Sequence, residues 1–410
     1  MKIAVIGGGA AGYFGAIAAA ETAKEGKVVI LEGTRKTLTK VRISGGGRCN
    51  VTHHCFDPAV LVKSYPRGER ELRGPFSRFQ PSDTVAWFAQ RGVDLKAEAD
   101  GRMFPITDNS QTVIDCLTKA SASAGVETRL GIIVKSIMTS PSENGFLVKW
   151  RDGEEVFDRV LLATGSSPSG HNLAQGIGHT ITPLAPSLFT FNIENQRLKD
   201  LAGLSFPDVE LTLQPRDQKQ VFKFRGPILI THWGLSGPAV LKLSAIAARE
   251  LFASEYRAQL KISFVPKRKA HEVFDELWSH KGARPKDIVA NCLPGDWPKR
   301  YNQRVFEILD LEHRKLWHDI SREQLKRLVT ELCETELLVC GKGVFKEEFV
   351  TCGGVDLREI DLKTMESRLV PGLYFAGEIM DIDGITGGFN FQNAWTTSWI
   401  AGQNLAAKNL

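Results

Sequence analysis

Short apolar runs that end in glycine open the chain. Residues 3–6 are apolar and lead directly into Gly7-Gly8-Gly9, a pattern typical of a strand buried on both faces of a parallel sheet. Residues 10–24 are rich in alanine and contain no proline, which predicts a helix, and residues 28–31 form a second apolar strand. Together these segments predict a strand–helix–strand unit of about thirty residues, the length that such a crossover needs.

The pattern of apolar and polar positions changes further along the chain. Residues 160–163 predict another buried strand, whereas apolar and polar residues alternate between about residues 183 and 266, which predicts antiparallel strands with one buried face. Residues 269–336 are charged, rich in Trp and helical in pattern. Glycines and short strands return near Thr351, and residues 393–408 predict a closing helix.

These patterns predict an α/β protein with a discontinuous Rossmann-type domain. In this interpretation residues 1–188 and 345–410 form the nucleotide-binding domain, and residues 189–268 form an inserted antiparallel β domain. Residues 269–344 form a small helical subdomain of the insert.

The composition excludes several classes of protein. The 410 residues are 42% hydrophobic and 24% charged, which excludes a disordered, collagen-like or coiled-coil chain. No apolar stretch reaches the roughly 18 residues that a membrane-spanning helix needs. The formal net charge of +5 is too small to indicate nucleic-acid binding, which clustered Lys and Arg would show. We therefore expect a small-molecule substrate, and neither a membrane nor a nucleic acid, as partner.

The cysteines and the first residues predict a cytoplasmic protein. Seven Cys without a CxxC pair argue against a disulfide scaffold and against a zinc site, so no metal site is expected. Met1-Lys2 leads straight into the first strand, whereas a secretory signal needs a longer apolar core.

The first chemical motif is a GxGxxG turn, formed by Gly7, Gly8, Gly9, Ala10, Ala11 and Gly12. Its three spaced glycines would allow the tight turn, the approach of a pyrophosphate to the backbone and close helix–strand packing. Phosphate would then meet the positive end of the helix. Glu32 follows twenty residues after Gly12, where a carboxylate accepts the ribose hydroxyl.

The second motif is a glycine-rich segment after Ser44, formed by Gly45, Gly46, Gly47, Arg48, Cys49 and Asn50. Consecutive glycines are costly to order, which favours close approach of the backbone to a planar or phosphate group over a mobile surface loop. Arg48 would supply a fixed cation and Asn50 an amide. Cys49 is interpreted as a packed small residue, not as a redox thiol.

The third motif spans residues 375–394, in which a short strand passes through a glycine-rich turn into a helix. The positive end of that helix suits the anionic N1–O2 edge of a reduced flavin ring. Glu378 or Asp381 would bind a polyol chain. A cation site at Asp381 and Asp383 is disfavoured, because the ligand spacing of a calcium loop is absent.

In these motifs the sequence resembles the FAD-binding Rossmann flavoproteins. More narrowly, it resembles the YhiN/BaiN-like family, some members of which are labelled aminoacetone-oxidase-like. The resemblance covers nearly the whole chain, from residue 7 to residue 394. The matching stretches are GGGAAG, SGGGRCN, GRMFP, ATG, THWGLSGPA, TCGGV and YFAGEIMDIDGITGGFNFQNA.

The resemblance implies FAD as cofactor and a role for individual residues. Gly7, Gly9 and Gly12 would hold the pyrophosphate, and Glu32 the adenosine ribose. The resemblance also implies that Thr164 and Gly165 lie beside the adenosine half, and that Gly377 and Glu378 lie beside the ribityl phosphate. It places the isoalloxazine between two segments. One segment is Gly45–Asn50, and the other contains Gly388, Asn390, Gln392 and Asn393.

Two segments depart from the family pattern. Residues 165–172 form a shorter turn than is usual and lack the family's Asp, and Trp399 stands where a glycine is common. In the insert, His232 precedes a Gly-Pro segment. It is either a general acid or base facing the flavin or merely a hydrogen-bonded residue in a turn that caps a helix.

The sequence therefore predicts an FAD-dependent oxidoreductase that transfers a hydride between flavin N5 and a small organic substrate. Only one GxGxxG occurs, so NAD(P)H would dock transiently as reductant, or the substrate would react with the flavin directly. The alternative is a flavin-containing binding or regulatory protein associated with RNA. The evidence for this alternative is two basic runs, at residues 267–269 and 299–300. Both runs are short, and short basic runs are more typical of a solvated surface.

Overall fold

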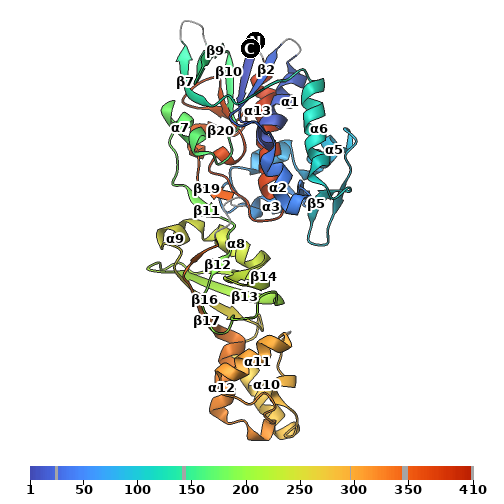
Figure 1. Ribbon diagram of the computed structural model, residues 1–410, viewed down its shortest axis with the longest axis vertical. Coiled ribbons are helices and arrows are strands. Elements are labelled where there is room, and N and C mark those ends of the chain that lie inside the picture. Colours follow the sequence, from blue (N-terminus) through green and yellow to red (C-terminus); the bar gives the residue numbers. More distant parts are fainter. Residues whose placement is uncertain (24–25, 141–144, 296, 344–349, 408–410) are drawn as a thin grey trace. The chain divides into compact units, whose positions relative to one another are not determined.

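The structure is a computed structural model that describes residues 1–23, 26–140, 145–295, 297–343 and 350–407. The chain divides into two compact units, Met1–Ala185 with Val350–Leu410, and Pro186–Phe349 (Figure 1). Each unit has its own hydrophobic core.

The first unit is built on a seven-stranded sheet in the order β20-β21-β22-β10-β1-β2-β6. β1 lies at its centre, where Ala4 is in register with Val160 on one side and Val29 on the other, both in parallel pairs. The strands of this sheet are β1 (Lys2–Ile6), β2 (Lys27–Glu32), β6 (Glu127–Leu130), β10 (Arg159–Leu162), β20 (Ile360–Asp361), β21 (Glu366–Ser367) and β22 (Leu373–Phe375). The apolar runs predicted as buried parallel strands are confirmed.

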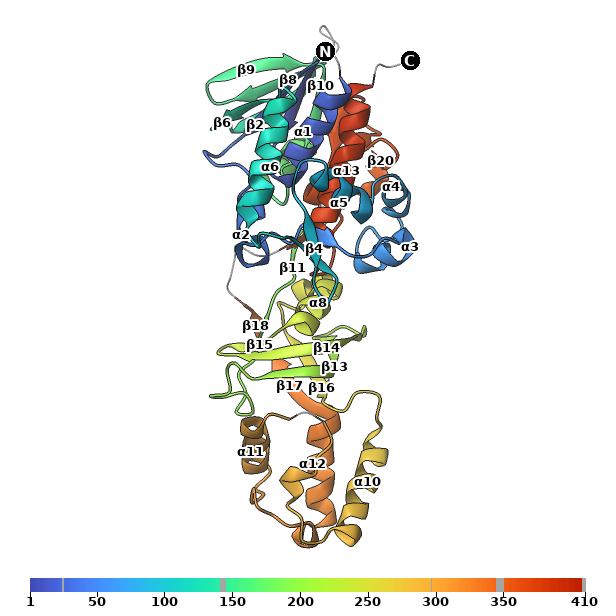
Figure 2. The same cartoon turned by 90° about the vertical axis from the view of Figure 1, so that its right-hand side faces the viewer.

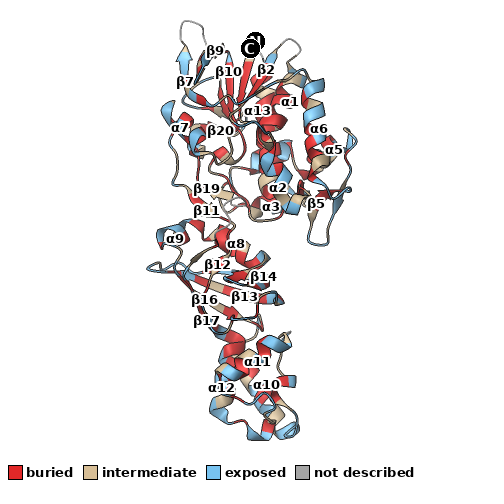
Figure 3. Cartoon of the chain, in the orientation of Figure 1, coloured by how far each residue is buried: buried red, intermediate tan, exposed pale blue. Residues whose placement is uncertain are grey.

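Two helices far apart in the sequence lie side by side against this sheet (Figure 2). They are α1 (Ala10–Thr22), which follows β1, and α13 (Phe389–Ala406), which follows β22. Figure 3 shows both as largely buried, together with β1, β2 and β10. The final residues expected in the two helices, Lys24 and Lys408, lie outside the described residues.

Smaller elements complete the first unit. The helices are α2 (Thr39–Gly47), α3 (Pro58–Leu61), α4 (Arg73–Arg78), α5 (Pro81–Ala89), α6 (Ser110–Ser123) and α7 (Pro168–Gly176). Two three-stranded sheets are formed by β3 (Thr52–His53), β5 (Arg102–Pro105) and β4 (Leu95–Ala97), and by β7 (Val134–Ser140), β8 (Gly145–Trp150) and β9 (Gly153–Phe157). The short strands β11 (Ala185–Ser187) and β19 (Val350–Cys352) stand at the two ends of the second unit's segment.

The second unit contains the predicted antiparallel sheet, in the order β17-β16-β13-β14-β15-β12-β18. Burial alternates along β13, β14 and β16 as the sequence predicts, and α8 packs on the buried face. The strands are β12 (Phe191–Asn192), β13 (Ser205–Pro215), β14 (Phe222–Thr231), β15 (Gly234–Ser236), β16 (Ala258–Ser263), β17 (Thr335–Val339) and β18 (Gly341–Lys342). The helices are α8 (Pro238–Ile246), α9 (Ala248–Ala253), α10 (Ala270–Ala283), α11 (Lys299–Ile308) and α12 (Arg322–Glu334).

Across the described residues, no helix is both long enough and apolar enough to cross a membrane. The same residues contain no group of three or more His, Cys, Asp or Glu that could hold a metal ion.

Candidate cofactor site

The turn between β1 and α1 has the geometry that its glycines predict. Gly7 has φ +109°, and a Cβ there would lie 2.5 Å from the carbonyl oxygen of Ala163. A Cβ on Gly12 would lie 1.8 Å from the carbonyl oxygen of Gly7, so both positions exclude any side chain. Gly9 differs, because a Cβ there would meet nothing within 4 Å. The backbone at Gly9 therefore leaves open space in front of α1.

No side chain caps the N-terminus of α1, whose first residues are Ala10 and Ala11. Its leading N–H groups and the positive end of the helix are suited to a phosphate. Glu32, at the end of β2, is fixed beside this turn: its Oε2 accepts from the Gly8 N–H at 2.6 Å and its Oε1 from the Thr34 N–H at 2.8 Å. A carboxylate keeps further lone pairs, so Glu32 can still accept ribose hydroxyls.

The glycine-rich segment after Ser44 breaks α2 rather than extending it. Gly45, Gly46 and Gly47 have φ values of +57°, +69° and +83°, and Cys49 follows at +62°. A Cβ on Gly46 or Gly47 would meet nothing within 4 Å, so these glycines, like Gly9, border open space. The left-handed backbone explains the run of glycines, because other residues rarely adopt it.

Arg48 and Cys49 have different surroundings. The guanidinium of Arg48 donates to Glu98 at 2.6 Å and lies 4.0 Å from the centre of the Phe104 ring, so its position is fixed from two sides. Its hydrogen bond with Glu98 raises the pKa of Arg48 above the ordinary value. Burial raises the pKa of the Cys49 thiol to about 12, which keeps it protonated and unreactive at neutral pH.

The turn before α13 lies against the glycine-rich segment. The Asn50 amide accepts from the Gly388 N–H at 2.9 Å and donates to the Thr52 carbonyl at 3.0 Å. Gly388 has φ +91°, and a Cβ there would lie 2.4 Å from that same carbonyl oxygen. The segments around residues 50 and 388 are therefore in direct contact, and their expected places on two sides of the isoalloxazine stay a prediction.

The three amides at the start of α13 have unequal roles. Asn390 donates to the Gly384 carbonyl and accepts from its N–H, both at 2.8 Å, and so holds the turn itself. Gln392 is fully buried and its amide is occupied by the hydroxyls of Thr52, Thr84 and Thr396. Asn393 is 1% exposed, and its Oδ1 has no hydrogen-bond partner among the described residues. Asn393 is thus the amide with an oxygen left for a ligand.

The ends of β10 and β22 add polar groups to the same edge of the sheet. A Cβ on Gly377, whose φ is +75°, would lie 3.0 Å from the Ala11 Cβ, which places the end of β22 directly beside α1. Glu378 follows, and Gly165 is close to it, since a Cβ there would lie 3.7 Å from Glu378 Oε2. The Oγ1 of Thr164 is buried and has no partner within the described part of the chain.

Sequence reasoning missed Lys40, which the fold brings to Glu378. Its Nζ donates to Glu378 Oε2 at 2.7 Å and to Ser166 Oγ at 3.0 Å, while Glu378 Oε1 accepts from the Thr351 N–H at 3.0 Å. The sequence shows only that a lysine stands just ahead of the glycine-rich segment. The ion pair could not be predicted from that position, because the partner of Lys40 lies 338 residues away.

Two histidines remain to be placed. His53 donates its Nδ1–H to the Gly387 carbonyl, 2.9 Å away, and packs on the Phe389 ring with 4.6 Å between ring centres. His53 is therefore a packed residue. His232 lies in the exposed turn between β14 and β15 of the second unit. Its role as general acid or base stays a prediction.

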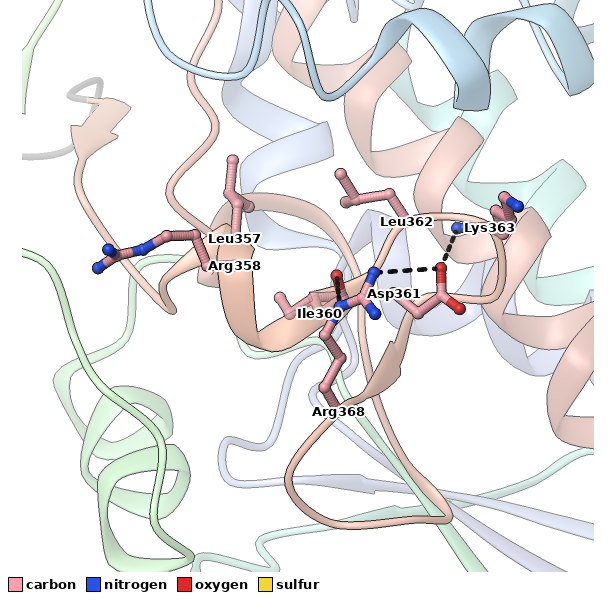
Figure 4. A pocket seen from close by; sticks show the side chains of 7 residues that line it. All are labelled: Leu357, Arg358, Ile360, Asp361, Leu362, Lys363 and Arg368. Atoms are coloured by element: carbon pink, nitrogen blue, oxygen red, sulfur yellow. Dashed lines mark hydrogen bonds and ion pairs between the residues drawn. The ribbon is translucent and has the colours of Figure 1, made fainter.

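A pocket of about 590 Å³ lies elsewhere in the first unit (Figure 4). Its lining residues are Leu357, Arg358, Ile360, Asp361, Leu362, Lys363 and Arg368. Arg368 donates to the Ile360 carbonyl at 3.2 Å and lies 3.8 Å from Asp361, so this cation is engaged within the pocket wall. None of the expected cofactor residues lines it.

The residues at the sheet edge fit a dinucleotide. Glycines at residues 9, 46 and 47 border open space, and buried oxygens of Thr164 and Asn393 lack partners among the described residues. A buried polar atom without a partner is costly, so such atoms commonly mark a ligand or an ordered water. Together with the open N-terminus of α1, they form the donor and acceptor set that FAD would use.

Comparison with known proteins agrees with this geometry. The family model described as "HI0933-like protein Rossmann domain" matches residues 1–404. The chain is 29% identical to the 3-dehydro-bile acid delta(4,6)-reductase of Clostridium scindens, over 99% of each chain. It is 30% identical to the ribosomal RNA dihydrouridine synthase of Escherichia coli, over 98% of this chain and 97% of the relative.

Among solved structures, the fold resembles that of 3-ketosteroid-delta4-(5alpha)-dehydrogenase from Rhodococcus jostii RHA1, with a TM-score of 0.53 and 15% identity over 99% of this chain and 96% of the other. The relatives are enzymes by name, which does not favour the alternative of a binding or regulatory protein. The chain belongs to the HI0933-like Rossmann family and is an FAD-dependent oxidoreductase.

Proposed function

We propose that this enzyme reduces a carbon–carbon double bond that is conjugated to a carbonyl group. The observation that carries the proposal is the pair of full-length relatives, at 29% and 30% identity, whose names describe reductions. A 3-dehydro-bile acid with double bonds at positions 4 and 6 is a conjugated dienone. Uridine becomes dihydrouridine when its C5–C6 double bond, conjugated to the C4 carbonyl, is saturated.

Each double bond that is saturated takes two electrons, so uridine needs one such step and a 4,6-dienone needs two. FAD, when bound and reduced, would supply a hydride to the far end of the conjugated system, which is the β carbon of an enone or the δ carbon of a dienone, and an acid would supply the proton. Two electrons must then return to the flavin from NAD(P)H. The chain's own contribution would be to hold the cofactor through the β1–α1 turn and Glu32, and to place the ring beside the contacting segments around Asn50 and Gly388.

We further propose a uridine in ribosomal RNA as the first substrate to test. Two relatives carry that name, the second being the Haemophilus influenzae protein at 28% identity over 96% of each chain. The modest net charge argued against nucleic acid, but a substrate held mainly by its base and by RNA shape needs few clustered cations. The cytoplasmic location expected from the sequence is compatible with this substrate.

The test is anaerobic. The purified yellow protein is reduced with NADH or NADPH, and the reduced flavin is then mixed with unmodified ribosomal RNA or with a 3-oxo-4,6-diene steroid. Reoxidation by one substrate, with dihydrouridine or a ketone that has lost one double bond found by mass spectrometry, supports the proposal and identifies the substrate. Reoxidation by oxygen but by neither substrate would overturn it and indicate an oxidase.

A further inference from the structure

His171 is a buried histidine whose ring has no hydrogen-bond partner among the described residues. The residue is 3% exposed, and both Nδ1 and Nε2 lack a partner. His179 offers a direct contrast within the same unit. It is 2% exposed, but its Nδ1 lies 3.0 Å from Glu359 Oε2 and its Nε2 lies 2.9 Å from Ser367 Oγ.

The unpartnered ring of His171 is energetically costly. A buried polar atom without a partner loses its hydrogen bonds to water and gains none in return, and a neutral imidazole has one donor and one acceptor to satisfy. A phenylalanine of similar shape would avoid this cost. The His171 side chain is therefore better explained by a group that supplies both a hydrogen-bond acceptor and a donor.

The position of His171 indicates where that group comes from. α7 follows the end of β10, and its Gly170 is pressed against Thr164, where a Cβ would lie 1.8 Å from the Thr164 Oγ1. That Oγ1 also lacks a partner in the described part of the chain. Burial lowers the pKa of His171, and the nearby charge of Glu378 opposes that shift in part. Thr164 and Glu378 are thus both close to this part of α7.

Glu378 itself does not satisfy the ring: its two oxygens accept from Lys40 and from the Thr351 N–H, and neither ring nitrogen of His171 has a hydrogen bond within the described residues. Of the residues near His171, Thr164 is expected beside the adenosine half of FAD and Glu378 beside the ribityl phosphate. Phosphate oxygens accept hydrogen bonds, and ribityl hydroxyls both donate and accept, so this segment of the cofactor matches both ring nitrogens.

We propose that His171 binds FAD directly: its neutral imidazole donates one N–H to an oxygen of the phosphate–ribityl segment and accepts a hydrogen bond at the other nitrogen. The inference rests on the cofactor placement described above. His171 lies in residues 165–172, the turn in which the sequence departs from the family pattern.

The test is the variant His171→Phe, prepared without cofactor. Two lost hydrogen bonds predict that the Kd for FAD, measured by quenching of flavin fluorescence, rises about tenfold or more. The Tm of the cofactor-free variant should equal or exceed that of the parent, because two unsatisfied atoms are removed. A raised Tm with an unchanged Kd would overturn the proposal.

The matched control is His179→Phe. It removes partners from Glu359 and Ser367, so the Tm of the cofactor-free protein should fall, while the Kd for FAD should stay within about twofold of the parent. If His171→Phe does not fold, His171→Gln and His171→Leu replace it. The proposal then requires tighter FAD binding by the glutamine variant, which keeps a donor and an acceptor, and equal affinities overturn it.

Failure of the cofactor placement is distinguishable from failure of this contact. Gly9→Val should block the pyrophosphate whatever His171 does. If neither Gly9→Val nor His171→Phe changes the Kd, the placement is wrong. If only Gly9→Val raises it, the placement holds and His171 has no contact with FAD.

Discussion

Gly402 of α13 lies directly against Gly15 of α1. A Cβ on Gly402 would come within 2.6 Å of the Gly15 carbonyl oxygen and within 2.7 Å of the Ala18 Cβ. The two helices therefore meet almost backbone to backbone. Because α1 begins at the phosphate turn and α13 begins beside Asn50, this crossing fixes the relative position of the two ends of the cofactor site.

Gly402→Ala should destabilise the protein by about 1–3 kcal/mol, because the added methyl group meets backbone atoms that cannot move independently. Urea unfolding measures the loss. Gly282→Ala in α10 is the control, since a Cβ there meets nothing within 4 Å. It should be neutral or stabilising by up to about 1 kcal/mol. Equal effects of the two substitutions would contradict the packing argument.

Gly9→Val should separate cofactor binding from folding. The backbone at Gly9 is extended, with φ −88° and ψ −168°, so valine fits it without strain. We expect the cofactor-free protein to keep its Tm, and the Kd for FAD to rise by about tenfold or more, since the side chain fills the space of a phosphate. Gly74→Val, also in open space, should change neither quantity.

Lys40→Met should weaken FAD binding while leaving stability nearly unchanged. The Lys40 side chain is 56% exposed, so its ion pair with Glu378 contributes less than about 1 kcal/mol to folding. Without Lys40, the Glu378 carboxylate faces the phosphates uncompensated. The Kd for FAD should rise about three- to tenfold at low salt, and the difference should shrink as salt is added. A difference that is independent of salt would point to lost packing instead.

Stability should fall in mild acid because of His179. Burial lowers the pKa of His179 below its ordinary value, although the hydrogen bond with Glu359 raises it in part. The unfolded chain therefore binds the proton more readily than the folded protein. The stabilising contribution is complete above about pH 6.5, the pKa in the unfolded chain, and is lost as pH falls through the lower folded-state value.

Urea unfolding at about pH 7.5 and about pH 5.5 checks this expectation. The loss of stability between the two should be smaller in His179→Phe than in the parent. Burial also lowers the pKa of His171, but this residue is present in both proteins and contributes equally to the pH dependence of each. The same pH dependence in variant and parent would exclude His179 as its source.

Arg67 and Asp383 form a buried ion pair that holds the turn before α13. Arg67 Nε donates to Asp383 Oδ1 at 2.6 Å and a second nitrogen binds Oδ2, with Asp383 fully buried. Arg67→Met should cost about 3–5 kcal/mol, because a buried carboxylate loses its principal counter-charge. Arg67→Met combined with Asp383→Leu should recover part of that loss. A double variant as unstable as the sum of the singles would contradict direct coupling.

Local pattern was enough to predict the elements that form the site. The strands around Val29 and Val160 and the GxGxxG turn follow from apolar runs and glycine spacing, and the structure confirms them. α13 begins four residues earlier than expected, at Phe389, because Gly388 adopts the left-handed conformation that ends the turn. The pair Gly387-Gly388 indicates such a turn, but it does not show at which residue the helix begins.

The side-chain partners could not be predicted from the sequence. Gln392 was expected beside the flavin, but its amide is occupied by three threonine hydroxyls, two of them more than 300 residues away. Lys40 and His171 gained significance only through Glu378 and Thr164, which the fold brings beside them. Such partners depend on tertiary proximity. Hydrophobic periodicity and secondary-structure propensity carry no information about it.

The first unit is assembled from two stretches of chain separated by the whole second unit, and this has a consequence for biosynthesis. β10 and α1 leave the ribosome well before β22 and α13, their neighbours in the finished sheet and helix pair. At about 5–20 residues per second, roughly 10–40 seconds pass between residue 185 and residue 389. Throughout that interval the nascent polypeptide exposes the unpaired edge of β10 and the face of α1 on which α13 later packs. A chain interrupted before residue 389 should therefore aggregate or recruit chaperones, however well the inserted unit has already folded.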